Sequence, residues 1–162
     1  LTRGADKVTI NREAVLNPGL ITEAAGRYGA QCVVVSIDYR TNDAGQPEVF
    51  INKAATPTGL DPRAFARTVA ELGAGEILLT NADRDGGGGG IDIDLVREVA
   101  DSVPIPVIAS GGVGLSMHFS EAFLEGHAQA VSAGTFFCFR DQNPMQARAH
   151  VRNADIPIRM EV

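Results

Sequence analysis

The stretch that decides the fold is residues 31–38, Gln-Cys-Val-Val-Val-Ser-Ile-Asp, in which an almost unbroken apolar run ends in a carboxylate. A second such run, Glu-Ile-Leu-Leu-Thr, occupies Glu76–Thr80. Apolar runs of this length without polar alternation are typical of parallel strands that are buried on both faces. The sequence therefore predicts five strands: Lys7–Ile10, Cys32–Ile37, Glu76–Thr80, Pro106–Ala109 and Ala130–Ala133.

Segments with helical periodicity separate these strands. Asp61-Pro62 supplies one clear helix start, with Asp as the N-cap and Pro at the first helical position. Regular alternation of strands and helices predicts right-handed crossovers and a parallel sheet, hence an α/β fold. One segment, Tyr39–Thr58, breaks the rhythm, and we expect a small extra hairpin there. The predicted helices are Pro18–Tyr28, Asp61–Leu72, Ile93–Ser102, Met117–Leu124 and Met145–Asn153.

Composition narrows the class of protein. The 162 residues carry a net charge of −6, with 44% hydrophobic and 21% charged residues. This length predicts one domain over residues 1–162. The acidic balance argues against nucleic acid and anionic membrane as partners. No apolar run approaches the ~18 residues of a membrane span, and no secretory signal opens the chain, so we expect a cytoplasmic setting.

The cysteines and histidines give no metal site. Cys32 and Cys138 are too few and too far apart for a disulfide scaffold or a zinc site, and we expect both to be small buried core residues. The three histidines, His118, His127 and His150, lack ligand spacing and are expected to be surface or capping residues.

Small and polar residues follow all five predicted strands. Ligands of parallel βα proteins bind beyond the carboxyl ends of the strands, so these residues mark the candidate site. Asp38 is expected to be partly desolvated, which raises a carboxyl pKa and suits acid–base chemistry; a turn or cap role is the alternative. The strand ends carry Asn11, Asp38, Thr80 to Asp85, Ser110 to Gly112, and Gly134-Thr135.

The sequence Ala-Ser-Gly-Gly-Val-Gly at 109–114 predicts a phosphate cradle between a strand and a helix. A tight turn without a ligand is the alternative. Gly134-Thr135 would form the other wall, and Asp85-Gly86 would border the cradle from the preceding strand. The five consecutive glycines, Gly86–Gly90, are expected to form a flexible loop beside this site.

Lys7 and Glu76 stand at strand starts, at the opposite end of the predicted sheet. Isolated charges there are commonly an ion pair or solvated strand ends.

Six segments resemble, in order, the cyclase subunit of imidazole glycerol phosphate synthase (the HisF family). The resemblance runs from the first residue to about Phe139. It implies a (βα)8 TIM barrel of about 250 residues, of which this chain would hold strands four to eight, the C-terminal five-eighths. The segments are Gly4–Asn11, Gln31–Asp38, Thr58–Leu60, Gly73–Thr80, Asp83–Gly86 and Pro106–Gly112.

The resemblance also implies an activity in histidine biosynthesis. Such a subunit takes ammonia from a partner glutaminase and closes an imidazole ring on a bisphosphorylated ribulosyl aminoimidazole. It releases imidazole glycerol phosphate and a carboxamide nucleotide, and it uses no cofactor.

Site residues follow from the same resemblance. Asp38 matches one of two catalytic aspartates, and Asn11 matches part of one phosphate site. Lys7 and Glu76 would belong to a charged gate through which ammonia enters, and Asp6 would face the glutaminase. The second phosphate site would be lined by Asp85, Gly86, Gly112 and Gly134. The substrate between the two phosphate sites would lie along Thr80 and Ser110.

Departures from the family pattern predict altered activity. The second catalytic aspartate, expected on the first strand, has no counterpart here, so we expect little or no turnover by this chain alone. Arg12 stands where the family has a small residue, Gly87–Gly90 stand where it has polar side chains, and Gly134 stands where Ser is common.

Two alternatives stay open. The tail Arg140–Arg148 looks more like paralogous cyclase subunits that use ammonia from a glutaminase in modifying surface sugars. The chain could also be a non-catalytic phosphate-binding half-barrel. Two exposed sheet edges would then lead it to associate with itself or with another chain.

Overall fold

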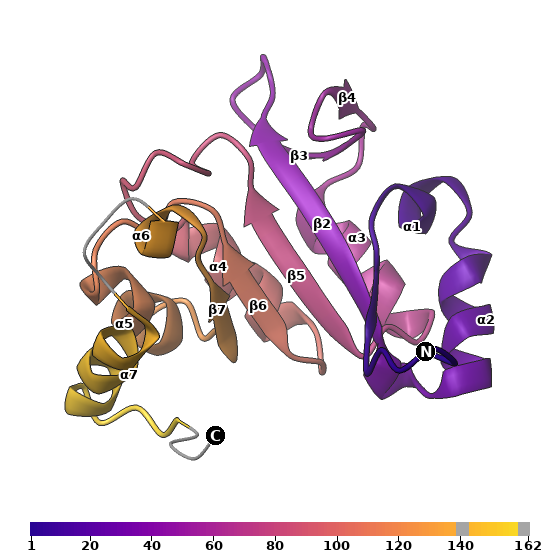
Figure 1. The fold of residues 1–162 in the computed structure, drawn as a ribbon. Coiled ribbons are helices and arrows are strands. Elements are labelled where there is room, and N and C mark those ends of the chain that lie inside the picture. The colour runs from indigo at the N-terminus through magenta and orange to yellow at the C-terminus, as the bar shows by residue number, and fades with distance from the viewer. Residues whose placement is uncertain (139–142, 159–162) are drawn as a thin grey trace.

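The computed structural model describes residues 1–138 and 143–158, and within them the chain forms a mostly parallel sheet of seven strands (Figure 1). Five strands are parallel neighbours: β1 (Val8–Ile10), β2 (Val33–Thr41), β5 (Glu76–Asn81), β6 (Val107–Ser110) and β7 (Ala130–Ser132). The strands β3 (Pro47–Ile51) and β4 (Thr56–Pro57) add an antiparallel extension beside the end of β2. The predicted α/β class, the five parallel strands and the extra hairpin are confirmed.

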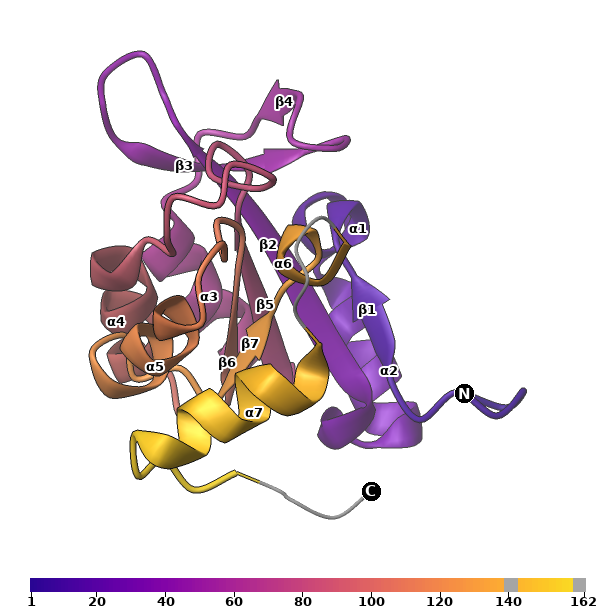
Figure 2. The same ribbon diagram turned by 60° about the vertical axis from the view of Figure 1, so that its left-hand side comes forward.

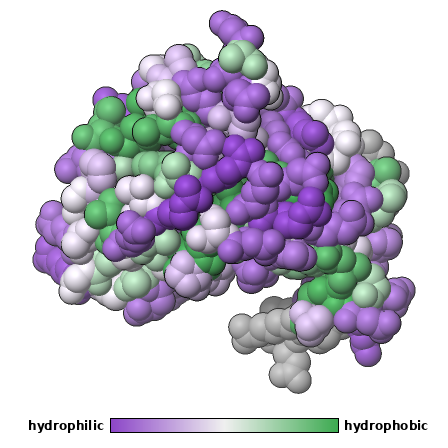
Figure 3. All heavy atoms as spheres, turned by 180° about the vertical axis from the view of Figure 1, so that it is seen from behind, coloured by the Kyte–Doolittle hydropathy of each residue, from purple (hydrophilic) through white to green (hydrophobic). Residues whose placement is uncertain are grey.

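The helices cover one face of the sheet. The longer helices α3 (Pro62–Glu71) and α4 (Ile93–Ser102) lie behind it in Figure 1, and none of the helices of the described residues crosses its front in that view. Figure 2 gives a second view of this arrangement. From behind, hydrophilic residues cover much of the helical layer (Figure 3), as expected of a solvent-facing side. The remaining helices are α1 (Arg12–Leu16), α2 (Gly19–Tyr28), η1 (Ala30–Cys32), α5 (Met117–Leu124), α6 (Thr135–Cys138) and α7 (Pro144–Asn153).

Alternate residues of each strand face opposite sides. In β2, Val35 and Ile37 are fully buried under the helices, whereas Ser36 and Asp38 face the other side and are half-buried. The strand register sets Ser36 beside Leu78 and Leu78 beside Ile108. One step further along, it aligns Asp38 with Thr80 and Thr80 with Ser110. The uncovered side, called here the open face, therefore has an apolar middle and a polar row at the carboxyl ends of the strands. This is the inner lining of a partial (βα) barrel.

Several details differ from the sequence-based expectations. Strand β2 continues to Thr41, so Asp38 lies inside the strand, because β3 pairs with residues 38–41. Cys32 is half-buried and Cys138 is exposed, so the expectation that both are buried core residues was wrong. The helices α1 and α6 were not predicted, because five and four residues are too short to show a helical period.

None of the helices within the described residues is long and apolar enough to cross a membrane.

Candidate active site

Asp38 is held by two neighbours at the carboxyl end of the sheet. Asn11 follows β1, and its Nδ2 donates to the Ser36 carbonyl at 3.0 Å and to Asp38 Oδ2 at 3.2 Å. Ser36 Oγ donates to Asp38 Oδ1 at 3.3 Å. Both oxygens of the carboxylate are therefore oriented before any ligand binds.

The pKa of Asp38 is raised above its ordinary value. Partial burial is the largest cause, and the negative charge of Asp85 raises the pKa further. The hydrogen bonds from Ser36 and Asn11 act in the opposite direction without reversing the shift. A carboxyl group with a raised pKa can both hold and release a proton closer to neutral pH, which is what general acid–base catalysis requires.

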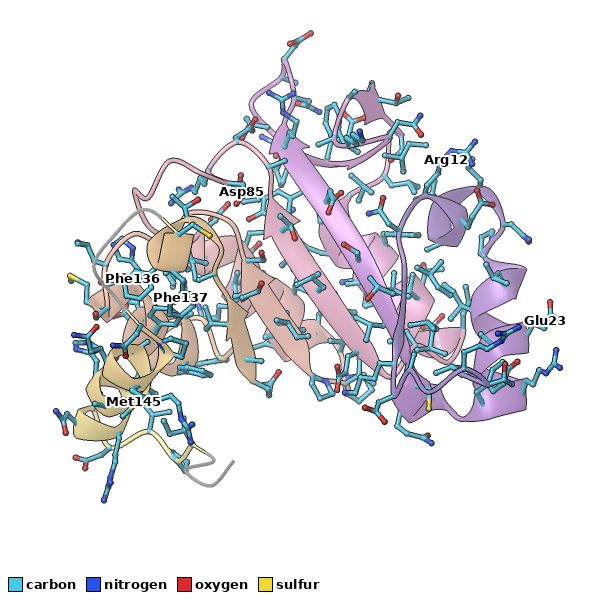
Figure 4. The ribbon with its side chains drawn as sticks, in the orientation of Figure 1. Arg12, Glu23, Asp85, Phe136, Phe137 and Met145 are labelled. Atoms are coloured by element: carbon cyan, nitrogen blue, oxygen red, sulfur yellow. The ribbon has the colours of Figure 1, made fainter. Side chains whose placement is uncertain are left out.

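Asp38 opens into a cavity of about 420 Å³, called here the Asp38 cavity. Two other predicted site residues line it: Thr80, which is aligned with Asp38 across the β2–β5 pair, and Asp85, in the loop after β5 (Figure 4). The other lining residues are Arg40, Lys53, Ala54 and Ala82. The structure thus brings together residues from two strands, one loop and the hairpin.

A smaller hollow, called here the glycine hollow, includes Asp85 in its lining and gathers predicted residues from three successive strand ends. Its volume is about 10 Å³, close to that of one water, so a phosphate would need its walls to move apart. A Cβ added to Gly134 on this wall would meet no atom within 4 Å, so a larger residue has room there. The hollow is lined by Asp85, Gly86, Ser110, Gly112 and Gly134, together with Gly111, Val113, Ser132, Ala133 and Thr135.

The helix α6, which follows Gly134, is anchored by aromatic packing. Phe136 is 1% exposed and meets Phe119 and Phe137 edge to face, with ring centroids 5.1 and 5.0 Å apart (Figure 4). Edge-to-face pairs of this kind stabilise beyond the area they bury. This packing fixes the wall of the glycine hollow that Gly134 and Thr135 form.

The loops on either side of the glycine hollow approach each other too closely for side chains. A Cβ on Gly112 would lie 2.2 Å from the Gly90 carbonyl oxygen, and one on Gly114 would lie 2.1 Å from that of Gly88. Gly90 N also donates to the Gly112 carbonyl at 2.8 Å. The Gly86–Gly90 run therefore has a docked conformation against the cradle, and its flexibility stays a prediction.

Sequence reasoning missed a polar network beneath the loop that carries Asp85. Asn81, only 5% exposed, accepts from the backbone N–H of Asp83 at 3.0 Å and of Arg84 at 3.1 Å through Oδ1. Asp92 Oδ2 accepts from Asn81 Nδ2 at 3.4 Å and from the Tyr39 hydroxyl at 3.2 Å. Burial and the Asp92 charge raise the pKa of Tyr39, which keeps its hydroxyl protonated as a donor. The strand-end position of Asn81 was the only signal of this network in the sequence.

His118 is a buried capping residue and not a surface residue. Its Nδ1 accepts from the backbone N–H of Gly114 at 3.1 Å and of Leu115 at 3.3 Å. It therefore holds the end of the predicted phosphate cradle. His127 pairs with Asp101 at 2.8 Å on the surface, as expected of a surface histidine.

The other end of the sheet carries an ion pair between Lys7 and Glu76, which links the starts of β1 and β5. Of the two alternatives that the sequence left open, an ion pair or solvated strand ends, the structure has the ion pair, and its role as an ammonia gate stays a prediction. Asp6 is exposed and makes no hydrogen bond or ion pair within the described part of the chain. Arg12 is exposed and pairs with the adjacent Glu13 (Figure 4).

In residues 1–138 and 143–158, no group of three or more His, Cys, Asp or Glu side chains is arranged to hold a metal ion.

The fold, together with the Asp38 cavity and the glycine hollow at the carboxyl ends of the strands (called here the rim), is typical of one class of protein. This class has (βα)-barrel architecture and binds its ligands at that end of the strands. Residues 1–142 match the family described as "Histidine biosynthesis protein", and the chain belongs to that family.

One relative comes from Prochlorococcus marinus (strain MIT 9313) and is named "Putative imidazole glycerol phosphate synthase subunit hisF2". It is 50% identical over 161 residues, which is 99% of this chain and 61% of the relative. The chain thus spans about three fifths of the length of that relative.

Proposed function

We propose that this chain is the C-terminal five-eighths of the cyclase subunit of an imidazole glycerol phosphate synthase, a cytoplasmic enzyme of histidine biosynthesis. The observation that carries the proposal is the arrangement around Asp38. Its carboxylate is held at both oxygens by Asn11 and Ser36 and shares a cavity with Thr80 and Asp85. The likeness to the P. marinus protein supports the same assignment.

In this proposal each part of the rim has one task. The glycine hollow binds one phosphate of the bisphosphorylated substrate, and Asn11 belongs to the site for the other phosphate. Thr80 and Ser110, aligned on neighbouring strands, contact the substrate between the phosphates. Asp38 moves a proton during imidazole ring closure, for which its raised pKa suits it.

Ammonia would reach this site from the opposite end of the sheet. There the Lys7–Glu76 ion pair bridges β1 and β5, and the exposed Asp6 lies next to it in the chain. We propose that a glutaminase subunit docks at this end and that the ion pair gates the passage of ammonia. No cofactor enters this chemistry.

Ring closure needs a proton donor and a proton acceptor, and the described site offers one suitably held carboxyl group, Asp38. The family's second aspartate, on a first strand, has no counterpart in this sequence. We therefore expect little or no turnover by this chain alone.

The test supplies the bisphosphorylated substrate with ammonium salt and measures imidazole glycerol phosphate. We expect no product from this chain alone, and product when a chain carrying the preceding part of the P. marinus relative is added. Asp38→Asn should abolish that product, whereas Arg67→Gln, an exposed change on α3, should not. Normal turnover by this chain alone would contradict the proposal, as would an active Asp38→Asn variant in the complemented assay.

The surface-sugar paralog is the second candidate, and the tail Arg140–Arg148 favours it. Residues 140–142 of that tail lie outside the described residues, and the helix α7 begins at Pro144. A ligand that binds only the folded state raises the melting temperature. Stabilisation by the histidine-pathway bisphosphate supports the cyclase, and stabilisation by a nucleotide sugar alone supports the paralog.

A further inference from the structure

The glycine hollow holds no positive side chain. Its lining residues include one charged group, the carboxylate of Asp85, and no Lys or Arg of the described chain. A phosphate bound there would meet glycine backbone and an unfavourable negative charge. Arg84, which lies beside Gly112, donates through Nη1 to the carbonyls of Gly90 and Ile91 and is committed to the loop. The adjoining Asp38 cavity, which shares Asp85 with the hollow, offers two further cations, Arg40 and Lys53.

Arg40 is already neutralised. Its Nε donates to Asp83 Oδ1 at 2.7 Å, and the other oxygen of Asp83 accepts from the Thr41 backbone N–H at 2.8 Å. Burial alone would raise the pKa of Asp83, but the bonds from Thr41 and Arg40 outweigh it and lower the pKa. The guanidinium of Arg40 also lies 5.8 Å from the centre of the Phe50 ring. Arg40 is therefore a fixed structural cation.

Lys53 is exposed and makes no hydrogen bond or ion pair with any of the described residues. It stands in the turn Asn52–Ala54, where three consecutive non-glycine residues have φ of 56, 61 and 55°. Left-handed conformations cost such residues roughly 1 kcal/mol or more each, and they persist only where the surrounding structure enforces them.

Three contacts enforce this turn. Ala55 N donates to the Ile51 carbonyl at 3.1 Å, and Asn52 Nδ2 donates to Thr56 Oγ1 at 3.1 Å. Arg40 Nη1 reaches the Ala54 carbonyl at 3.5 Å, so the cation that binds Asp83 also holds the turn. The strained turn and the Arg40–Asp83 pair together place Lys53 on the wall of the Asp38 cavity.

We propose that Lys53 is a ligand-binding residue that pairs with a phosphate of a phosphorylated polyol at the junction of the Asp38 cavity and the glycine hollow. Asp38 and Thr80 hold the hydroxyl groups of the same ligand, and Arg40 is a positioning residue that acts through the turn. The proposal rests on the proposed function for the location of the site. It adds a cation from the β3–β4 hairpin, which lies outside the strand-end rim.

The lysine content of this chain permits a direct test. Lys7 and Lys53 are its only lysines, so amine-reactive labelling followed by peptide mass spectrometry reports on each separately. Saturating imidazole glycerol phosphate or ribose 5-phosphate should slow the labelling of Lys53 at least several-fold and leave Lys7, at the opposite end of the sheet, unchanged. Equal labelling of Lys53 with and without both ligands would overturn the proposal.

Affinity measurements supply the second test. Lys53→Gln should weaken binding of the two phosphorylated probes about 10-fold, the order expected for losing one charged contact. Lys53→Arg should retain most of the affinity. Arg67→Gln makes the same change of charge on α3 and should bind as the parent does. The parent chain should bind unphosphorylated ribose more weakly than ribose 5-phosphate. The parent chain and Lys53→Gln should have the same affinity for ribose.

A Lys53→Gln variant that binds the phosphorylated probes as tightly as the parent does overturns the proposal. A parent chain that binds neither phosphorylated probe also overturns it.

The two proposals fail in different ways. Lys53-dependent binding of ribose 5-phosphate, with no product in the complemented cyclase assay, would uphold Lys53 and reject the cyclase. Product formation by Lys53→Gln with unchanged kcat and KM would uphold the cyclase and reject Lys53. Circular dichroism of each variant checks that the exposed substitutions leave the fold intact.

Discussion

The raised pKa of Asp38, which suits acid–base chemistry, also lowers the free energy of unfolding at neutral pH. Its side chain is half-buried on the open face, where burial and the charge of Asp85 outweigh the two hydrogen bonds that favour its ionised form. The folded protein therefore binds the Asp38 proton more tightly than the unfolded chain does. Such a group destabilises the fold once pH rises above the unfolded pKa of about 3.9, and the penalty is complete above the raised folded pKa.

Replacing Asp38 with Asn should therefore stabilise the protein at pH 7, by up to about 1 kcal/mol. An amide can accept from Asn11 and donate to Ser36 Oγ, so both contacts survive the change. At pH 3 Asp38 is protonated in both states, and the gain should vanish. Thermal unfolding at the two pH values measures this, with Asp43→Asn as control, because the Asp43 side chain is exposed and makes no hydrogen bond or ion pair with the described residues. An Asp38→Asn variant that is less stable at pH 7 would contradict the prediction.

His118 should matter through the two amides that it caps. His118→Leu leaves the Gly114 and Leu115 N–H groups without an acceptor, at a cost of about 2 kcal/mol in the free energy of unfolding. His118→Asn retains one side-chain oxygen and should recover part of that loss. Urea denaturation gives both values. Equal stability of His118→Leu and the parent chain would show that the cap contributes nothing.

At the scale of elements, the contact between the two glycine-rich loops can be tested with a matched pair. Gly114→Ala places a Cβ 2.1 Å from the Gly88 carbonyl oxygen, and backbone must move to relieve the clash. We expect a loss of about 2 kcal/mol in the free energy of unfolding. Gly89→Ala meets nothing within 4 Å and should be neutral or slightly stabilising, because it restricts the unfolded chain. Similar urea midpoints for the two variants would argue against loop docking.

The elements that the sequence predicted well are those whose own residues carry the signal. The apolar runs at Glu76 and Pro106 match β5 and β6 to within one residue at each end. The end of β2 was missed, since Asp38 to Thr41 are mostly polar and form a strand only because β3 pairs with them. A partner that is distant in sequence leaves no local trace.

The site residues also divide into those that the sequence indicates and those that only the three-dimensional structure reveals. The rule that ligands bind at strand ends predicted Asp38, Thr80 and the glycine hollow, because topology alone brings those positions together. Lys53 was not predicted, since its place depends on a left-handed turn. Asn81 was marked only by its strand-end position, and its buried amide network depends on three-dimensional geometry that residue type and spacing do not reveal.

At the scale of the whole molecule, the open face is the surface that leaves apolar side chains and strand edges uncovered. Leu78 lies in its middle, beside Ser36 and Ile108, and is only half-buried. Among the described residues, the strands β1 and β7 each have one parallel neighbour and therefore leave an edge of the sheet unpaired. Proteins normally pair or cover such edges. The same face is the inner lining of a barrel in the proposed larger enzyme.

We therefore expect the chain to self-associate through the open face and its edges at micromolar concentrations. Leu78→Glu should abolish this association, because a carboxylate buried in the apolar middle of an interface would be desolvated without a partner. Its cost to the folded monomer should be small, since Leu78 is already half-exposed to solvent. Leu124→Glu, at a residue 58% exposed on the helix α5, introduces the same charge away from the open face and should leave association unchanged.

Sedimentation velocity over a concentration series distinguishes the monomer from the associated species. A parent chain that stays monomeric throughout contradicts self-association. If adding the preceding part of the P. marinus relative converts the parent, but not Leu78→Glu, into a one-to-one complex, the open face is the surface that completes the barrel.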